Sequence, residues 1–304
     1  MIGRIAEIAQ DGRHLARERG FMTISTRDAE VGRVPLDDLG AVIANAHGLT
    51  YTNSLLVALS ERGVPVVVCG ANHSPAGVLW PAAAHHLQAG RIDAQIACKQ
   101  PARKRIWAEI VRAKIRHQAA VLDAVGCPSL ALRAMIRKIR SGDPANIEAQ
   151  AARVYWVKLF GSGFLRDRDE TGVNSFLNYG YTVLRAATAR AVMAAGLHPS
   201  IGLHHSNKLN SMRLVDDLME PFRPFIDLRV YALAHAGYSE LDAITKRSLV
   251  EVLLVDLEAP WGISPVGACA QHLATSLALT LTGERRSLEF PKPQVPAELL
   301  TCTT

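Results

Sequence analysis

The feature that most constrains the fold is a change in hydrophobic period near residue 82. Before it, β-rich runs at residues 21–26 and 64–69 are separated by turn residues, which indicates strands. One short helix is expected at residues 52–62, because Thr52 is a good N-cap. After residue 82, apolar residues recur every three or four positions as far as about Gly283, which predicts helices. We therefore expect an α+β fold, with a small N-terminal β-rich domain followed by a larger all-α-helical C-terminal domain.

The expected helices span residues 82–98, 101–125, 129–140, 143–159, 174–195, 212–236, 241–257 and 265–282. Local chemistry supports several boundaries: Pro101 suits a first helical turn, Gly126 suits a helix end, and Asp143 before Pro144 is typical of a helix start. The domains are expected at residues 1–81 and 82–283. The tail at residues 284–304 contains three prolines and is expected to be extended or disordered.

The composition is that of a soluble globular protein, since 49% of the 304 residues are hydrophobic and 20% are charged. No apolar run approaches the ~20 residues of a membrane span. Arg4 and Glu7 interrupt the first apolar residues, so no secretion signal is predicted. A cytoplasmic protein without a membrane partner is the default expectation. Five scattered cysteines without a CxxC pair indicate neither a zinc site nor a disulfide framework.

Positive charge is concentrated in one segment of the chain. Residues 91–140 carry 12 positive and 3 negative charges, whereas residues 1–90 carry 7 and 8, and residues 141–304 carry 15 and 17. Such a block indicates a polyanionic partner such as DNA, although a pair of solvated basic helices would have the same composition. The predicted DNA-binding residues are Arg103, Lys104, Arg105, Arg112, Lys114 and Arg116.

A second pattern combines histidines with acids. His204 and His205 precede an expected helix on which Asp217 and Glu220, three residues apart, project from one face. Two such carboxylates can hold one cation, and a histidine on the preceding loop can supply a third ligand. Mg²⁺ and Mn²⁺ prefer carboxylates, and Mn²⁺ also accepts imidazole. Taken alone, the spacing favours an ordinary solvated helix face, because acids at helical spacing are common.

Other kinds of active site are not indicated. The chain has no Gly-rich phosphate loop and no GxGxxG fingerprint, so no nucleotide cofactor is expected. It has no GxSxG elbow for Ser-His-Asp catalysis. A cluster of acids and histidine beside a basic surface suits phosphodiester chemistry best.

Three segments resemble a known family. Residues 148–156 read Glu-Ala-Gln-Ala-Ala-Arg-Val-Tyr-Trp, which resembles the E-x-x-A-A-R-x-Y-[FW] helix of the CRISPR-associated integrase that inserts new spacers. The turn at residues 202–205 and the segment at residues 217–224 resemble the other two motifs of that family, in their type II form. The order of elements at residues 34–69 is also similar. The resemblance covers nearly the whole chain up to about Gly283, and its three motifs stand in the correct order.

The resemblance implies that Glu148, His205 and Glu220 are the catalytic residues and bind Mg²⁺ or Mn²⁺. His204 is the second choice for the histidine ligand, and Asp217 is a neighbouring acid. Other branches of the family have aspartate where this chain has Glu220. We expect a metal site to tolerate the longer side chain.

The implied activity is that of a metal-dependent DNA integrase of CRISPR adaptation, which joins prespacer 3′-hydroxyls to the repeat ends of a CRISPR array by transesterification. The implied partners are DNA, a second copy of the chain in a homodimer formed through the N-terminal domain, and a small dimeric CRISPR-associated adaptation partner in a larger complex. A stand-alone metal-dependent DNA endonuclease is the alternative, and a non-catalytic DNA-binding subunit is a third possibility.

Overall fold

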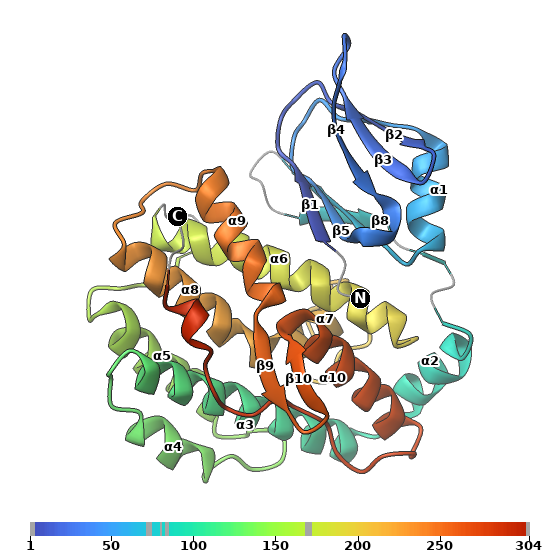
Figure 1. Ribbon diagram of the computed structural model, residues 1–304. Helices are drawn as coiled ribbons and strands as arrows, with labels where there is room; N and C mark the ends of the chain where they lie inside the picture. Colours follow the sequence, from blue (N-terminus) through green and yellow to red (C-terminus); the bar gives the residue numbers. More distant parts are fainter. Residues whose placement is uncertain (1–3, 71–74, 80, 83–84, 168–171, 302–304) are drawn as a thin grey trace.

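The computed structural model describes residues 4–70, 75–79, 81–82, 85–167 and 172–301. Its N-terminal part is built of short strands and one helix (Figure 1). The elements are β1 (Arg4–Ile8), β2 (His14–Glu18), β3 (Phe21–Ser25), β4 (Glu30–Pro35), η1 (Leu36–Asp38), β5 (Leu39–Ala44), β6 (Thr50–Tyr51), α1 (Asn53–Glu61), β7 (Val66–Cys69) and β8 (Pro75–Leu79).

The strands form two four-stranded sheets. One has the order β1-β5-β7-β8, with parallel pairs except for the antiparallel β7-β8 pair, and the other has the order β4-β3-β2-β6. Every residue of β5 is buried, as is typical of a parallel strand covered on both faces. Leu15, Met22 and Leu55 belong to the core between the sheets and α1. The Thr52 side chain accepts a hydrogen bond from the Leu55 amide at 3.3 Å, which confirms the expected helix cap.

The C-terminal part is mostly helical, so the predicted α+β class is confirmed. Its elements are α2 (Gln88–Ala97), α3 (Gln100–Ala124), α4 (Leu130–Ile136), α5 (Ile147–Phe160), α6 (Val173–Ala194), α7 (Arg213–Met219), η2 (Glu220–Phe222), α8 (Arg223–His235), α9 (Ala243–Glu251), η3 (Val252–Leu254), β9 (Asp256–Ala259), β10 (Gly262–Pro265), α10 (Val266–Leu281) and η4 (Ala297–Leu299). Helix α6 contacts α7, α8, α9, α10 and strand β5. Within the described residues, no helix is both long and apolar enough to cross a membrane.

Two expectations about this part were wrong. The single helix expected at residues 212–236 is interrupted by the 3₁₀ turn η2, because Pro221 and Pro224 each lack the amide hydrogen that an uninterrupted α-helix needs. The helix expected at residues 241–257 ends at Glu251, and an antiparallel β9-β10 hairpin follows. The tight connection of this hairpin uses Gly262 at φ 116°, a conformation that favours glycine. The C-terminal part is therefore not entirely α-helical.

The tail has little regular secondary structure and packs against the helical part. Leu288 and Leu299 are buried. Arg229 on α8 donates hydrogen bonds to the carbonyls of Glu298 and Thr301, at 2.9 and 2.6 Å. The described tail residues are therefore fixed to the protein by side-chain contacts and by a backbone hydrogen bond from the Lys292 amide to the Glu258 carbonyl at 2.7 Å.

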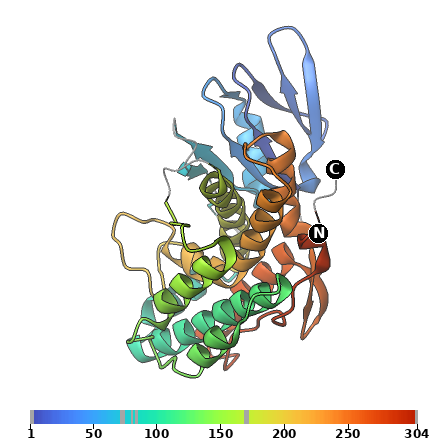
Figure 2. The same cartoon turned by 90° about the vertical axis from the view of Figure 1, so that its left-hand side faces the viewer.

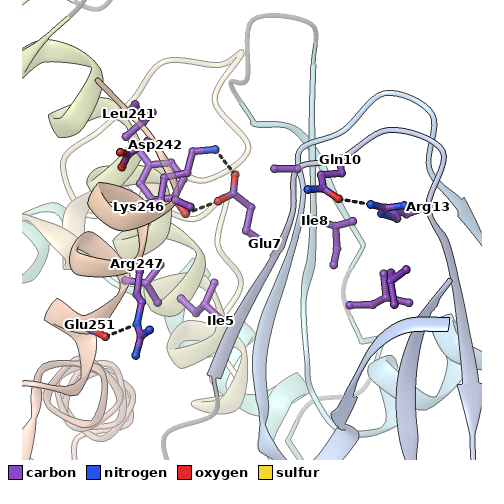
Figure 3. Close-up of a pocket in the computed structure, with 16 residues that line it drawn as sticks. Ile5, Glu7, Ile8, Gln10, Arg13, Leu241, Asp242, Lys246, Arg247 and Glu251 are labelled. Carbon is purple, nitrogen blue, oxygen red and sulfur yellow. Dashed lines mark hydrogen bonds and ion pairs between the residues drawn. The ribbon is translucent and has the colours of Figure 1, made fainter. Parts of the chain in front are cut away.

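The N-terminal part lies above α6, with α9 beside it (Figures 1 and 2). A cleft of about 580 Å³ separates β1 from α9, and Figure 3 shows the residues that line it. In this cleft, Glu7 of β1 accepts hydrogen bonds from the Tyr179 hydroxyl at 2.6 Å and from Lys246 at 2.9 Å. Burial and the bond to Glu7 raise the pKa of Tyr179. Glu7 therefore links the sheet to both α6 and α9.

Candidate functional site

Helix α3 carries Lys114 on the same face as its apolar residues. Ile110 and Val111 are buried four and three positions before it, so the helical period directs the lysine side chain into the protein as well. Lys114 is 8% exposed. A buried ammonium must be paired to be stable, and two carboxylates supply this pairing.

Helix α5 places Glu148 in its first turn. Asn146 adopts a left-handed conformation with φ 51° and caps the Ala149 amide at 3.3 Å. The Asp143 carboxylate accepts hydrogen bonds from the Ile147 and Glu148 amides, both at 2.9 Å. The predicted helix start at Asp143 is therefore four residues too early, because Asp143 caps the helix from outside it. The double cap fixes the backbone of Glu148 at the positive end of the helix dipole.

Glu220 lies where α7 gives way to η2. Pro221 ends the α-helical hydrogen bonding, and the ring Nδ1 of His117 on α3 lies 2.6 Å from the Pro221 carbonyl oxygen. This contact holds η2 against α3 and places Glu220 beside Lys114. Nε of Arg223, at the start of α8, lies 3.0 Å from Oε1 of Glu220. Glu220 is 6% exposed.

The carboxylates of Glu148 and Glu220 both contact the side-chain nitrogen of Lys114. Nζ of Lys114 pairs with Oε1 of Glu148 and lies 2.5 Å from Oε2 of Glu220. Burial disfavours the charged forms of Lys114 and Glu220, but the opposite charges outweigh it, so the pKa of Lys114 is raised and that of Glu220 is lowered. Two carboxylates from separate helices thus converge on the position of a single cation.

A loop at residues 202–206, here called the histidine loop, is organised by Asp217. The fully buried Asp217 carboxylate accepts backbone hydrogen bonds from Leu203 at 2.6 Å and from His204 and His205, both at 3.2 Å. It also lies 2.7 Å from Nδ1 of His205. Gly202 is required here, because a β-carbon would lie 2.8 Å from the His205 carbonyl and 3.1 Å from Asp217. Asp217 therefore fixes both the loop and the imidazole.

The arrangement leaves Nε2 of His205 as the nitrogen that can bind a ligand. The hydrogen bond to Asp217 raises the pKa of His205 despite its burial, and the charges of Asp217 and Glu220 raise it further. His204 instead stacks on Trp107 of α3, with ring centres 4.2 Å apart and planes 2° apart. The contacts of the two histidines therefore differ, and those of His205 suit a ligand better.

A second buried network, made of hydrogen bonds to Asp227, lies next to Arg223. The Asp227 carboxylate accepts hydrogen bonds from the hydroxyls of Tyr155, at 3.1 Å, and Tyr181. The Arg223 guanidinium lies 4.6 Å from the centre of the Tyr181 ring. Burial raises the pKa of Asp227 to about 7, although both hydroxyls favour the ionised form. This network connects α5, α6 and α8 at the base of the site.

The donor set suits a hard divalent ion. Glu148 and Glu220 share one cation position, and Oε2 of Glu220 is buried without a well-aligned hydrogen-bond donor in the described part of the chain. Lys114 occupies that position, however. No three His, Cys, Asp or Glu side chains among the described residues are close enough together to hold a metal ion. The structure thus brings the two glutamates together, and the ligand set including His205 stays a prediction.

The predicted DNA-binding residues have different environments. Lys104, Arg105 and Arg116 are exposed on α3. Arg103 donates to the Gln95 carbonyl at 3.0 Å, and Arg112 donates to the Ile139 carbonyl at 2.6 Å. Lys114 is buried between the glutamates, which sequence reasoning did not anticipate. Its position within the apolar period of α3 was the available indication.

Asp217 was expected either to share a cation with Glu220 or to be a neighbouring acid. Its carboxylate instead accepts the hydrogen bonds of the histidine loop. Asp227 was not considered. The partners of Asp217 lie 12 to 14 residues away, and Tyr155 lies 72 residues from Asp227. Asp216 has an ordinary structural role, since it forms an ion pair with Arg185 at 2.7 Å. Arg223 pairs with Glu220.

Comparison with known proteins agrees with this fold. Residues 7–256 match the family model described as CRISPR associated protein Cas1. A CRISPR-associated endonuclease Cas1 from Neisseria meningitidis serogroup C is 38% identical over 250 residues, which cover 81% of this chain and 82% of the relative. A solved casposase bound to integration product has a TM-score of 0.82 at 20% identity, with 99% of this chain and 96% of that chain covered. A Cas6-RT-Cas1–Cas2 complex has a TM-score of 0.74 at 18% identity, covering 98% of this chain and 36% of that longer chain.

The two solved structures are at most 20% identical to this chain, so their likeness shows a shared fold. The family model and the Neisseria relative show membership of a family. The chain is thus one of the CRISPR-associated proteins. Within that class it belongs to the Cas1 family.

Proposed function

We propose that this protein is a metal-dependent DNA integrase of CRISPR spacer acquisition, of the type II form, which joins the 3′-hydroxyls of a short duplex to the repeat ends of the array by transesterification. The observation that carries the proposal is the convergence of Glu148 and Glu220 on one cation position, and the orientation of the His205 imidazole by Asp217 supports it. Support also comes from the relative named an endonuclease and from the casposase bound to integration product.

Glu148, His205 and Glu220 would hold Mg²⁺ or Mn²⁺, since their donors are carboxylate oxygens and an imidazole nitrogen. When bound, such an ion stabilises negative charge on the scissile phosphate. Asp217 orients His205, and Arg223 neutralises the second oxygen of Glu220. The exposed cations Lys104, Arg105 and Arg116 would bind the DNA backbone. The other three basic residues, Arg103, Arg112 and Lys114, would contact DNA after their present contacts within the protein are broken.

The partners proposed are a prespacer duplex, the CRISPR repeat, a second copy of this chain, and a small dimeric adaptation protein. The Cas6-RT-Cas1–Cas2 complex supports the last of these. The β-rich N-terminal residues 1–81 are proposed as the dimerisation domain and the helical residues as the catalytic domain. Transesterification exchanges one phosphodiester for another, so no nucleotide hydrolysis is required to drive it.

A strand-transfer assay tests the proposal. The protein and its partner are incubated with a labelled duplex bearing free 3′-hydroxyls and a plasmid carrying the repeat. Wild type should yield joined products that disappear with EDTA. Glu220→Gln should abolish joining while keeping duplex affinity in a gel-shift assay, because binding depends on distributed Lys and Arg contacts. Glu251→Gln, at a partly exposed position on α9 that pairs with Arg247, is the matched control and should behave as wild type.

The alternative function is a stand-alone metal-dependent DNA endonuclease, which the names of the curated relatives favour. Such an enzyme would use the same acids with water as the nucleophile. It would give only shorter DNA products in the same assay. Activity insensitive to both EDTA and Glu148→Gln would instead indicate a non-catalytic DNA-binding subunit.

A further inference from the structure

Lys114 has contacts that an ordinary basic surface residue does not have. Its side chain is 10% exposed, and its ammonium pairs with Glu148, whose side chain is 27% exposed, and with Glu220, whose side chain is 8% exposed. The lysine comes from the middle of the 25-residue helix α3, whereas the two acids come from α5 and η2. The three elements therefore meet at this nitrogen.

A lysine in this position and a divalent ion between the same oxygens exclude each other. Mg²⁺ bonds to carboxylate oxygen at about 2.0–2.1 Å. Nζ already lies 2.5 Å from Oε2 of Glu220 and also contacts Glu148, so the two cations would overlap. Repulsion between their like charges adds to the steric conflict, and it is strong where water is excluded.

The ammonium also performs a task that a metal would otherwise perform. Two carboxylates held close together, one of them buried, repel each other, and one of them would take up a proton if no cation lay between them. Lys114 removes this repulsion, and Arg223 assists at the outer oxygen of Glu220. The side chains of the site thus keep their convergent arrangement through a cation that belongs to the protein.

We infer that Lys114 is an internal counter-cation that competes with the divalent ion: the ammonium and the metal occupy the space between Glu148 and Glu220 alternately, and metal binding displaces the lysine. This inference rests on the proposed function, since it assumes that these glutamates bind the metal. Its consequence is that Lys114 weakens metal affinity while it stabilises the site in the absence of metal.

Calorimetric titration of the full-length protein with Mn²⁺ tests the competition. Lys114→Met removes the charge and keeps the length of the side chain, so it should bind Mn²⁺ at least tenfold more tightly than wild type. Lys114→Arg keeps the charge and should not gain affinity. Lys246→Met, which removes the lysine paired with Glu7 in the cleft beside α9, is the matched control and should bind Mn²⁺ as wild type. Affinity of a folded Lys114→Met that is unchanged or weaker would overturn the inference.

A measurement on the wild-type protein avoids any loss of folding in the variants. Lysines are acetylated with acetic anhydride, with and without Mn²⁺, and the products are mapped by mass spectrometry. Lys114 should be protected without Mn²⁺ and should become reactive with it, while the exposed Lys138 and Lys208 react equally in both conditions. Protection of Lys114 that persists in saturating Mn²⁺ would show that the lysine is not displaced.

The two proposals fail differently. If Glu220→Gln binds Mn²⁺ as well as wild type, the proposed metal site is wrong, and the inference about Lys114 is wrong with it. If Glu220→Gln loses Mn²⁺ binding but Lys114→Met binds it no more tightly than wild type, the metal site stands and the competition is refuted.

Discussion

Replacing Asp227 with asparagine should remove a pH dependence from the folding stability of the protein. The carboxyl group is buried, and its pKa is raised to about 7 from an ordinary value of 3.8. Between these two values the folded protein binds a proton that the unfolded chain does not. The raised pKa therefore contributes stability that is fully present below about pH 4 and is lost as the pH rises through about 7.

The magnitude follows from the linkage relation. One proton taken up on folding changes the free energy of unfolding by about 1.4 kcal/mol per pH unit. Between about pH 5.5 and pH 7 the wild type should lose about 2 kcal/mol through this group, with little further change above. Asparagine has no charge at either pH, and its amide can still bond to the hydroxyls of Tyr155 and Tyr181.

The assay is urea unfolding of wild type and Asp227→Asn at about pH 5.5 and pH 8. The stability of wild type relative to the variant should fall by about 2 kcal/mol between the two conditions. Asp93→Asn, at an exposed position on α2, is the matched control and should parallel wild type. If Asp227→Asn also parallels wild type, the carboxyl group is not held neutral by burial and the reasoning is wrong.

Three further changes test other contacts. Asp217→Asn should lower stability by about 2 kcal/mol and speed hydrogen exchange in the histidine loop, because an amide cannot accept all four hydrogen bonds; unchanged exchange would contradict the assigned role. Arg105→Glu combined with Arg116→Glu should weaken duplex binding and reduce its salt slope by about 2, and an unaltered slope would place the DNA elsewhere. Glu7→Gln should destabilise the protein by about 2 kcal/mol in urea unfolding, because Lys246 loses its partner; equal stability would show that the pair is dispensable.

Sequence periodicity predicted the helices best where a helix has clear local ends. Helix α3 was expected at residues 101–125 and is found at Gln100–Ala124, because Pro101 and Gly126 mark its limits. Prediction failed where the chain changes structure within one apolar period. The apolar residues of α7, η2 and α8 follow one another without a gap, and only Pro221 and Pro224 interrupt the helix.

The acids of the site could be predicted from the sequence, but the lysine between them could not. Motif resemblance named Glu148 and Glu220, which the structure brings onto one nitrogen. It could not assign Lys114, because charge counting treats every lysine of a basic helix alike, whereas burial depends on which face packs inward. The contacts of Asp227 with two tyrosines depend on packing between helices far apart in the chain, which no local pattern reveals.

The attachment of the histidine loop to α7 has a mechanical consequence. Asp217 holds the histidine loop and lies three residues before Glu220. The His205 imidazole and the Glu220 carboxylate are therefore both attached to one short segment at the end of α7. Any sliding of this segment carries both groups together and leaves their mutual spacing intact. In the proposed metal site, the distance that can then change is the one between this segment and the capped end of α5.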